Sequence, residues 1–116
     1  ITPRYMEKFP EGAVVRVSTT LSEAASAIES TEHAALTHIG SGIVRQWFAR
    51  PEAAARWLAA SGARGWKGVI ECAGENAKAS LDLWPSCGGD FAIMKQIKNM
   101  FDPEGLLNIG RLFGRI

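Results

Sequence analysis

This sequence of 116 residues lacks an excess of charge of one sign and long apolar runs, and it has few cysteines and histidines. Thirteen basic and twelve acidic residues leave a formal net charge of +1, so composition gives no argument for binding nucleic acid or an anionic membrane surface. No apolar run approaches the roughly 20 residues that a membrane-spanning helix needs, and we expect no integral membrane segment. The first residues also lack the basic start and apolar stretch of a secretory signal. We therefore expect a cytoplasmic protein.

Two cysteines, Cys72 and Cys87, are too few for a disulfide framework, and without a secretory signal we expect both to be reduced. The two histidines, His33 and His38, are five positions apart across an expected strand, which places them on opposite faces. No Cys-x-x-Cys or His-x-x-x-His pair occurs, so we predict no metal site. A cysteine nucleophile needs a base within hydrogen-bond reach. Cys72 falls in an expected strand and Cys87 has no histidine near it in sequence, so we predict no catalytic residue.

The glycine-rich and aromatic segments carry no recognisable chemistry either. Residues 40–42 and 87–90 match neither a phosphate loop nor a dinucleotide-binding fingerprint, and we interpret their glycines as turn residues. A stacking platform for single-stranded nucleic acid would need a positive groove, which the balanced charge does not favour. We expect core and interface packing for five large aromatic residues, which are Trp47, Phe48, Trp57, Trp66 and Trp84.

The first 73 residues follow the order strand, helix, strand, strand, helix, strand. Valine-rich residues 13–18 predict the first strand, and the capping-box spacing of Thr20 and Glu23 precedes a helical period over residues 21–30. Pro51 suits the first turn of the second helix, which we expect Gly62 to close in a left-handed conformation. The other strands are expected at residues 34–39, 43–49 and 67–73, with residues 40–42 as a hairpin turn.

Each strand–helix–strand half of this order can cross over right-handed, which places both helices on one face of the sheet. We therefore predict an α+β fold, a ferredoxin-like four-stranded antiparallel sheet with two helices on one face, plus an extra C-terminal helix and tail. The chain is expected to form a single domain, 1–116. Its core and a long polar connection would span 1–89, after a polar opening segment over 1–12, and the helix and tail would span 90–116.

Residues 90–113 combine an amphipathic helix with a sharp turn and an apolar tail. Apolar residues recur there at intervals of three and four, at Phe91, Met94, Ile97 and Phe101. Polar residues fall on the other side, at Lys95, Lys98 and Asn99. We expect this helix to lie on a core with a basic outer face. Asp90 is expected to cap its first turn, Pro103 to end it near Asp102, and residues 102–105 to form a turn.

Segment 94–98 followed by 101–111 resembles the carboxy-terminal ending of the FAD-linked oxidase family. That family typically ends in a basic helix, an Asp-Pro-x-Gly turn, an apolar pair, Asn-Pro-Gly and a basic residue. Here the turn is followed by the pair Leu106 and Leu107 and then by residues 108–111, with Ile109 at the position of the usual proline. The likeness covers about the last quarter of the chain, and a tryptophan-containing segment ahead of the helix, residues 82–84, adds to it.

The resemblance implies the C-terminal cap fragment of a FAD-dependent 2-hydroxy-acid oxidase subunit, of the kind found in glycolate oxidase complexes. The family's cap is built on a ferredoxin-like sheet, and its FAD is held mostly by an upstream FAD-binding domain that this sequence does not include. The implied partners are that upstream domain, other subunits of a glycolate oxidase-like complex and a small 2-hydroxy acid. Attachment to the inner membrane would be peripheral, through the partner subunits. The implied cofactor-binding residues are Asn108, Gly110 and Arg111.

Two alternatives stay open at this point. Asn108 can shape a turn without touching flavin, because asparagine is common in turns. The chain can also be a free-standing ferredoxin-like binding or oligomerisation module without a cofactor.

Overall fold

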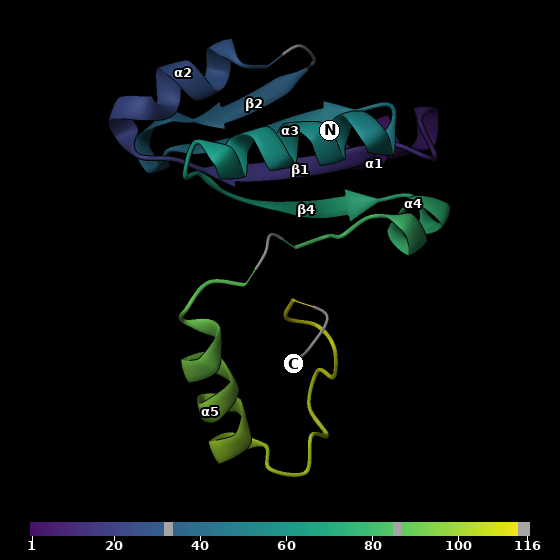
Figure 1. Ribbon diagram of the computed structural model, residues 1–116. Helices are drawn as coiled ribbons and strands as arrows, with labels where there is room; N and C mark the ends of the chain where they lie inside the picture. The colour runs from purple at the N-terminus through teal and green to yellow at the C-terminus, as the bar shows by residue number, and fades with distance from the viewer. Residues whose placement is uncertain (32–33, 85–86, 114–116) are drawn as a thin grey trace. The chain divides into compact units, whose positions relative to one another are not determined.

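The chain is described by a computed structural model over residues 1–31, 34–84 and 87–113. It divides into two compact units, Ile1–Leu83 and Trp84–Ile116 (Figure 1). The first unit contains the whole sheet, and the second contains one helix and the C-terminal tail.

The first unit is an α+β fold built on one antiparallel sheet. Its strands are β1 (Ala13–Ser18), β2 (Ala35–His38), β3 (Ile43–Phe48) and β4 (Lys67–Ala73), in the order β2-β3-β1-β4. Its helices are α1 (Thr2–Lys8), α2 (Ala24–Glu29), α3 (Pro51–Ala63) and α4 (Glu75–Ser80), with short 3-10 turns η1 (Leu21–Glu23) and η2 (Ile39–Ser41). The element order and the antiparallel pairing confirm the predicted ferredoxin-like arrangement.

Alternate residues of the central strand β1 form the middle of the core. Val15 and Val17 are fully buried, and Val17 pairs with the buried Val44 of β3 on the same face. Ala27 of α2 and Ala54 of α3 belong to this core cluster, so both helices cover the same face of the sheet. Each buried valine contributes about 1.5–3 kcal/mol relative to an exposed one. The valine-rich sequence therefore explains both the strand and its burial.

The opposite face of the sheet carries charged side chains. Arg16 of β1 lies opposite Arg45 of β3, and Glu71 of β4 lies close to both arginines. The Arg45 Nε atom donates to Glu71 Oε2 at 2.8 Å, and Arg16 Nε lies 3.5 Å from Glu71 Oε1. The β1–β4 register shifts between Val14 and Val15, which makes Glu71 the extra residue of a bulge.

Two local predictions differ from the structure at the ends of helices in the first unit. The predicted helix stop at Gly62 is wrong, because α3 continues to Ala63 and Gly65 takes the left-handed conformation with φ of 79°. The Trp66 N–H donates to the Ser61 carbonyl at 3.0 Å. This hydrogen bond closes the end of the helix beyond the expected position at Gly62. At the start of the first helical segment, the Thr20 hydroxyl bonds the Glu23 carboxylate at 2.7 Å rather than capping a backbone amide.

Two segments expected to be irregular contain short helices. Residues 1–12 include α1, where a proline occupies the first turn and the rings of Tyr5 and Phe9 lie 4.8 Å apart between centroids. The connection after β4 includes α4, in which Lys78 Nζ bonds Glu75 Oε1 at 2.8 Å. Spacings of four and three residues bring such pairs together on a helix, and both pairs are present in the sequence.

The second unit contains α5 (Phe91–Phe101), which ends one residue before the predicted position. No residue of α5, all of which the structure describes, is buried, so the second unit does not itself cover the apolar face of this helix. Phe101 is 77% exposed and Ile97 48% exposed. The second unit is too small to close a core around one short helix. The predicted cap is also wrong, since the Asp90 side chain makes no capping hydrogen bond within the described residues.

Candidate functional site

The turn after α5 is organised around the carboxylate of Asp102, which is 7% exposed. The N–H of Leu106 donates to Asp102 Oδ1 and the N–H of Leu107 to Oδ2, both at 2.9 Å. The Gly105 N–H donates to the Asp102 carbonyl at 3.1 Å, and Gly105 adopts a φ of 64°, which glycine tolerates without strain. The predicted Asp-Pro-Glu-Gly turn is therefore confirmed, and the Asp102 side chain binds the backbone that follows it.

Lys98 completes this arrangement from α5. Its ammonium donates to the Asp102 carboxylate, four residues away, and to the carbonyl of Leu107 in the tail. This charged hydrogen bond, followed by those from the Leu107 and Leu106 amides, lowers the pKa of Asp102 to about 2 from its ordinary 3.8. Asp102 is therefore ionised at neutral pH, and its charge is compensated by Lys98.

The three predicted cofactor-binding residues lie together in the next turn of the tail. The Arg111 N–H donates to the Asn108 carbonyl at 3.1 Å, which closes the turn over residues 108–111. Asn108 has a φ of 48° and Gly110 a φ of 71°, both in the left-handed region that asparagine and glycine accept. The side chains of Asn108 and Arg111 are exposed. The turn therefore displays one amide and one guanidinium group that are three residues apart in sequence.

A small pocket of about 180 Å³ lies between α5 and this tail. Gly110 and Ile109 line it from the tail, and Lys95, Lys98 and Asn99 line it from α5. The polar side of α5, predicted to be its outer face, thus lies against the tail. Asp102 also lines the pocket and compensates Lys98, so Lys95 supplies its one remaining positive charge beside the Asn99 amide.

The far end of the tail is held by aromatic rings. Phe113 lies 5.3 Å from Trp84 and 5.6 Å from Phe91 between ring centroids, and the second pair is edge-on. Such pairs contribute about 0.5–1.5 kcal/mol beyond the area they bury. The tail is therefore fixed near the start of α5 by Phe113 and near its end by Asp102.

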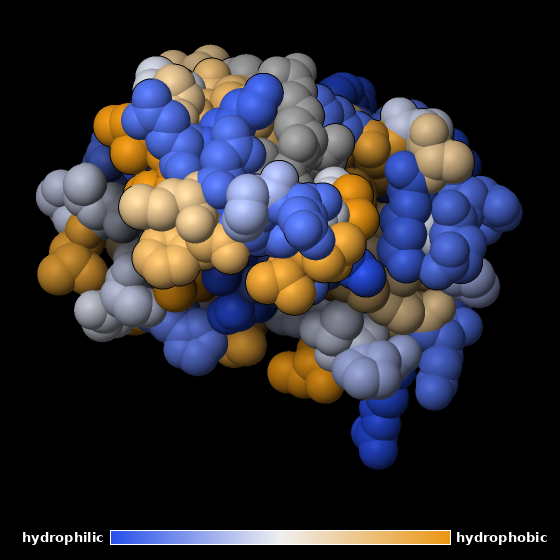
Figure 2. Space-filling view, turned by 90° about the horizontal axis from the view of Figure 1, so that it is seen from below, coloured by the Kyte–Doolittle hydropathy of each residue, from blue (hydrophilic) through white to orange (hydrophobic). Residues whose placement is uncertain are grey.

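The apolar pair between these two fixed points is exposed. Leu106 is 70% exposed and Leu107 is 61% exposed. Their backbone amides are bonded by Asp102 while their side chains extend outward. Figure 2 shows apolar side chains lying beside hydrophilic ones on the surface it presents. The tail thus carries a fixed backbone with apolar side chains available for contact.

Sequence reasoning missed Asp102, Lys98 and Phe113 as the residues that shape the tail. The four-residue spacing of Lys98 and Asp102 and the preference of aspartate to bond amides just after a turn were readable signals. Phe113 had no local signal, because its contact with Trp84 joins residues far apart in sequence.

The remaining predicted chemistry can be placed only in part. Cys72 and Cys87 are free and half-buried. Within residues 1–31, 34–84 and 87–113, no group of three or more metal-binding side chains is close enough to hold an ion. His33 lies outside the described residues. In that same described part of the chain, no helix is both long and apolar enough to cross a membrane.

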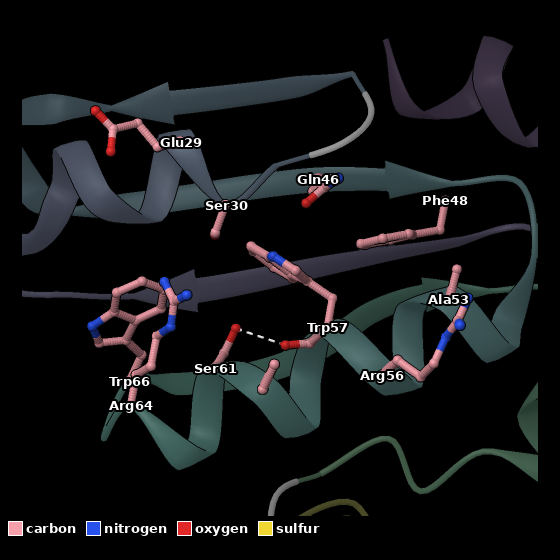
Figure 3. A pocket seen from close by; sticks show the side chains of 11 residues that line it. Glu29, Ser30, Gln46, Phe48, Ala53, Arg56, Trp57, Ser61, Arg64 and Trp66 are labelled. Carbon is pink, nitrogen blue, oxygen red and sulfur yellow. Dashed lines mark hydrogen bonds between the residues drawn. The ribbon is translucent and has the colours of Figure 1, made fainter.

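A larger pocket, of about 540 Å³, lies in the first unit between the end of α2, strand β3, helix α3 and the start of β4 (Figure 3). We call it the helix-side pocket, and its lining includes Gln46, Trp57 and Arg64. Gln46 is fully buried and shares its face of β3 with Val44. Sequence reasoning did not identify this pocket, although the two-residue period of β3 places a glutamine on the apolar face.

Comparisons with family models, curated proteins and solved structures each found no match.

Proposed function

We propose that this chain is the C-terminal cap portion of a FAD-dependent 2-hydroxy-acid oxidase subunit of the glycolate oxidase type. The observation that carries the proposal is the tail, in which a turn locked by Asp102 leads to an exposed turn with Asn108 and Arg111. This geometry accompanies the sequence resemblance of residues 101–111 to the ending of FAD-linked oxidases. The ferredoxin-like sheet agrees with the cap that this family uses.

The chemistry of the exposed turn fits the polar edge of a flavin. The Asn108 amide offers both a donor and an acceptor, and Arg111 offers a permanent positive charge. The carboxylate of Asp102 is engaged by Lys98 and by two backbone amides, so its charge is already compensated within the unit. FAD, bound mainly by an upstream domain, would supply the two-electron oxidation of a small 2-hydroxy acid. In this proposal the residues of the tail only position the cofactor.

The apolar side chains beside this turn support contact with another domain. Leu106, Leu107 and Ile109 are each more than 60% exposed and surround Asn108 in sequence. Their burial against the proposed FAD-binding domain would stabilise the interface by about 25 cal/mol for each Å² removed from water. The partners in this proposal are that domain and the other subunits of the complex, with a cytoplasmic location and peripheral attachment to the inner membrane.

Two substitutions at Asn108 separate flavin contact from a turn role. In the full-length subunit, Asn108→Gly keeps the left-handed backbone and removes the amide, whereas Asn108→Ala removes the amide and also strains the backbone. Flavin retention should fall about equally in both variants, while Gln96→Ala, an exposed change on α5, should leave it unchanged. If Asn108→Gly retains flavin like the unaltered protein, the amide does not contact the cofactor.

The helix-side pocket favours a second candidate, a ferredoxin-like binding module that acts without flavin. Its volume falls within the roughly 300–1,000 Å³ typical of small-molecule sites. The two candidates differ in one measurement, the titration of this chain and its upstream domain with FAD. Saturable flavin binding by the pair favours the oxidase, and its absence favours the module.

A further inference from the structure

The helix-side pocket has aromatic walls. Trp57 rises from α3 toward β3, and its ring lies 5.8 Å from that of Phe48 with a 46° tilt (Figure 3). Trp66, at the start of β4, forms a third aromatic surface of the same pocket. Aromatic rings prefer offset or edge-to-face contacts with other rings. Phe48 and Trp66 are buried, so Trp57, which is half-buried, is the ring of this wall that a planar aromatic ligand can contact.

A polar group lies in this apolar setting. Gln46 is fully buried on β3, next to Phe48 and on the same face as Val44. Its amide has two donor hydrogens and an acceptor oxygen with two lone pairs, and it interacts within the protein. A buried amide is costly in an apolar core unless it is hydrogen-bonded. Gln46 therefore places a partnered polar group behind the lining of the pocket.

The exposed rim of the pocket carries an excess of positive charge. Arg56 and Arg64 line the pocket together with Glu29, which leaves one uncompensated cation. The Arg64 guanidinium lies 5.0 Å from the centroid of the Trp66 ring, close enough for a cation–π contact. That contact holds a positive charge beside one aromatic wall. An anionic substituent on a bound ring would therefore meet a favourable charge.

We propose that the helix-side pocket binds a small planar aromatic molecule that carries one negative charge. All the residues that line the helix-side pocket belong to the first unit, Ile1–Leu83. The proposal therefore goes beyond the flavin-related function and does not depend on the upstream domain. Loss of flavin binding leaves it intact, and loss of this ligand leaves the flavin proposal intact.

Isothermal titration of the 116-residue chain with 2-naphthoate, and with uncharged 2-naphthamide, tests the ligand class. We expect saturable binding of one naphthoate per chain, at least about fivefold tighter than that of naphthamide, which corresponds to about 1 kcal/mol. Absence of saturable naphthoate binding overturns the proposal. Equal affinity for the two compounds overturns its charge requirement.

Charge reversal at the rim tests the location. Arg64→Glu should weaken naphthoate binding about fivefold or more, because it replaces an attractive charge by a repulsive one. Arg50→Glu makes the same net-charge change just before α3, outside the residues that line the pocket, and should change binding less than twofold. Equal weakening by both variants shows general charge attraction and contradicts a site in this pocket. Both arginines are exposed, so neither substitution disturbs the core.

Removal of an aromatic wall gives a second test. Trp57→Leu should abolish the preference for naphthoate over an aliphatic carboxylate such as hexanoate, provided that circular dichroism shows a folded chain. If this variant unfolds, the comparison of Arg64→Glu with Arg50→Glu decides alone.

Discussion

In the first unit Val15 and Val17 of β1 and Val44 of β3 are fully buried in the core that α2 and α3 help to form, whereas in the second unit no residue of α5 is buried. The first unit thus has its own hydrophobic core, and the second is shaped by the bonds of Asp102 and by the rings around Phe113. An apolar helix and tail that remain exposed while their backbone is fixed are suited to contact with another domain. This difference supports the proposal that the tail meets a partner and the sheet does not need one to fold.

A matched pair of phenylalanine substitutions tests the comparison with the largest expected effect. Phe48→Ala in the core should lower the free energy of unfolding by about 3–5 kcal/mol, because it removes a buried ring and leaves a cavity. Phe101→Ala removes a ring that is 77% exposed and should change it by less than about 0.5 kcal/mol. Urea unfolding monitored by circular dichroism measures both. A loss at Phe101 as large as that at Phe48 would show that α5 belongs to the same core.

Two left-handed glycines sharpen the comparison. A Cβ at Gly42 would lie 2.3 Å from the Thr19 carbonyl oxygen, so Gly42→Ala combines backbone strain of about 1–2 kcal/mol with a steric clash of similar size. At Gly105 no described atom lies within 4 Å of the added Cβ, so Gly105→Ala carries the strain alone. Thermal unfolding should show a clearly lower midpoint for Gly42→Ala. Equal midpoints for the two variants would mean that the backbone around η2 shifts enough to relieve the clash with Thr19.

Acid should release the tail before it disturbs the sheet. The pKa of Asp102 is lowered to about 2 in the folded chain from 3.8, so its contribution to the turn is present above pH 4 and is lost as pH falls toward 2. Nuclear magnetic resonance should show the Leu106 and Leu107 amides shifting with that titration while the β1 amides stay unchanged. In Lys98→Met the midpoint should move upward toward 3.8, and an unchanged midpoint would exclude Lys98 as the main cause.

The cluster of Glu71 with Arg16 and Arg45 on the other face of the sheet should give the smallest effect. Glu71→Gln weakens the pairing with Arg45 and Arg16, whose side chains are partly exposed, and should cost less than about 1 kcal/mol in unfolding free energy. Urea unfolding at low and at high salt measures it. A loss of several kcal/mol would mean that polar contacts matter as much in the first unit as in the second.

The fold was predictable because its signals are local. The valine alternation of β1 and the bounds of β4 agree with the residues predicted, since each pattern reflects burial on one face. The packing of α5 was not predictable, because amphipathicity shows which face is apolar and does not show what covers it. The left-handed residue after α3 is Gly65 rather than Gly62, and the backbone hydrogen bond from Trp66 to Ser61 that goes with it is not specified by residue type alone.

The site was predictable to a lesser degree. The turn at residues 102–105 follows from Pro103 and Gly105, whose conformational preferences are strong. The bond from Lys98 to the Leu107 carbonyl required the structure, because it joins residues nine positions apart. The helix-side pocket also required the structure, since its residues come from α2, β3, α3 and the connections beside them.

The flavin content of the longer protein tests the central claim most directly. The chain should be expressed together with the reading frame that precedes Ile1, and the purified product measured for visible flavin absorbance and for FAD released on denaturation. The account predicts a yellow protein with about one FAD per chain, reduced on addition of a small 2-hydroxy acid such as glycolate. A colourless product that binds no added FAD would contradict it.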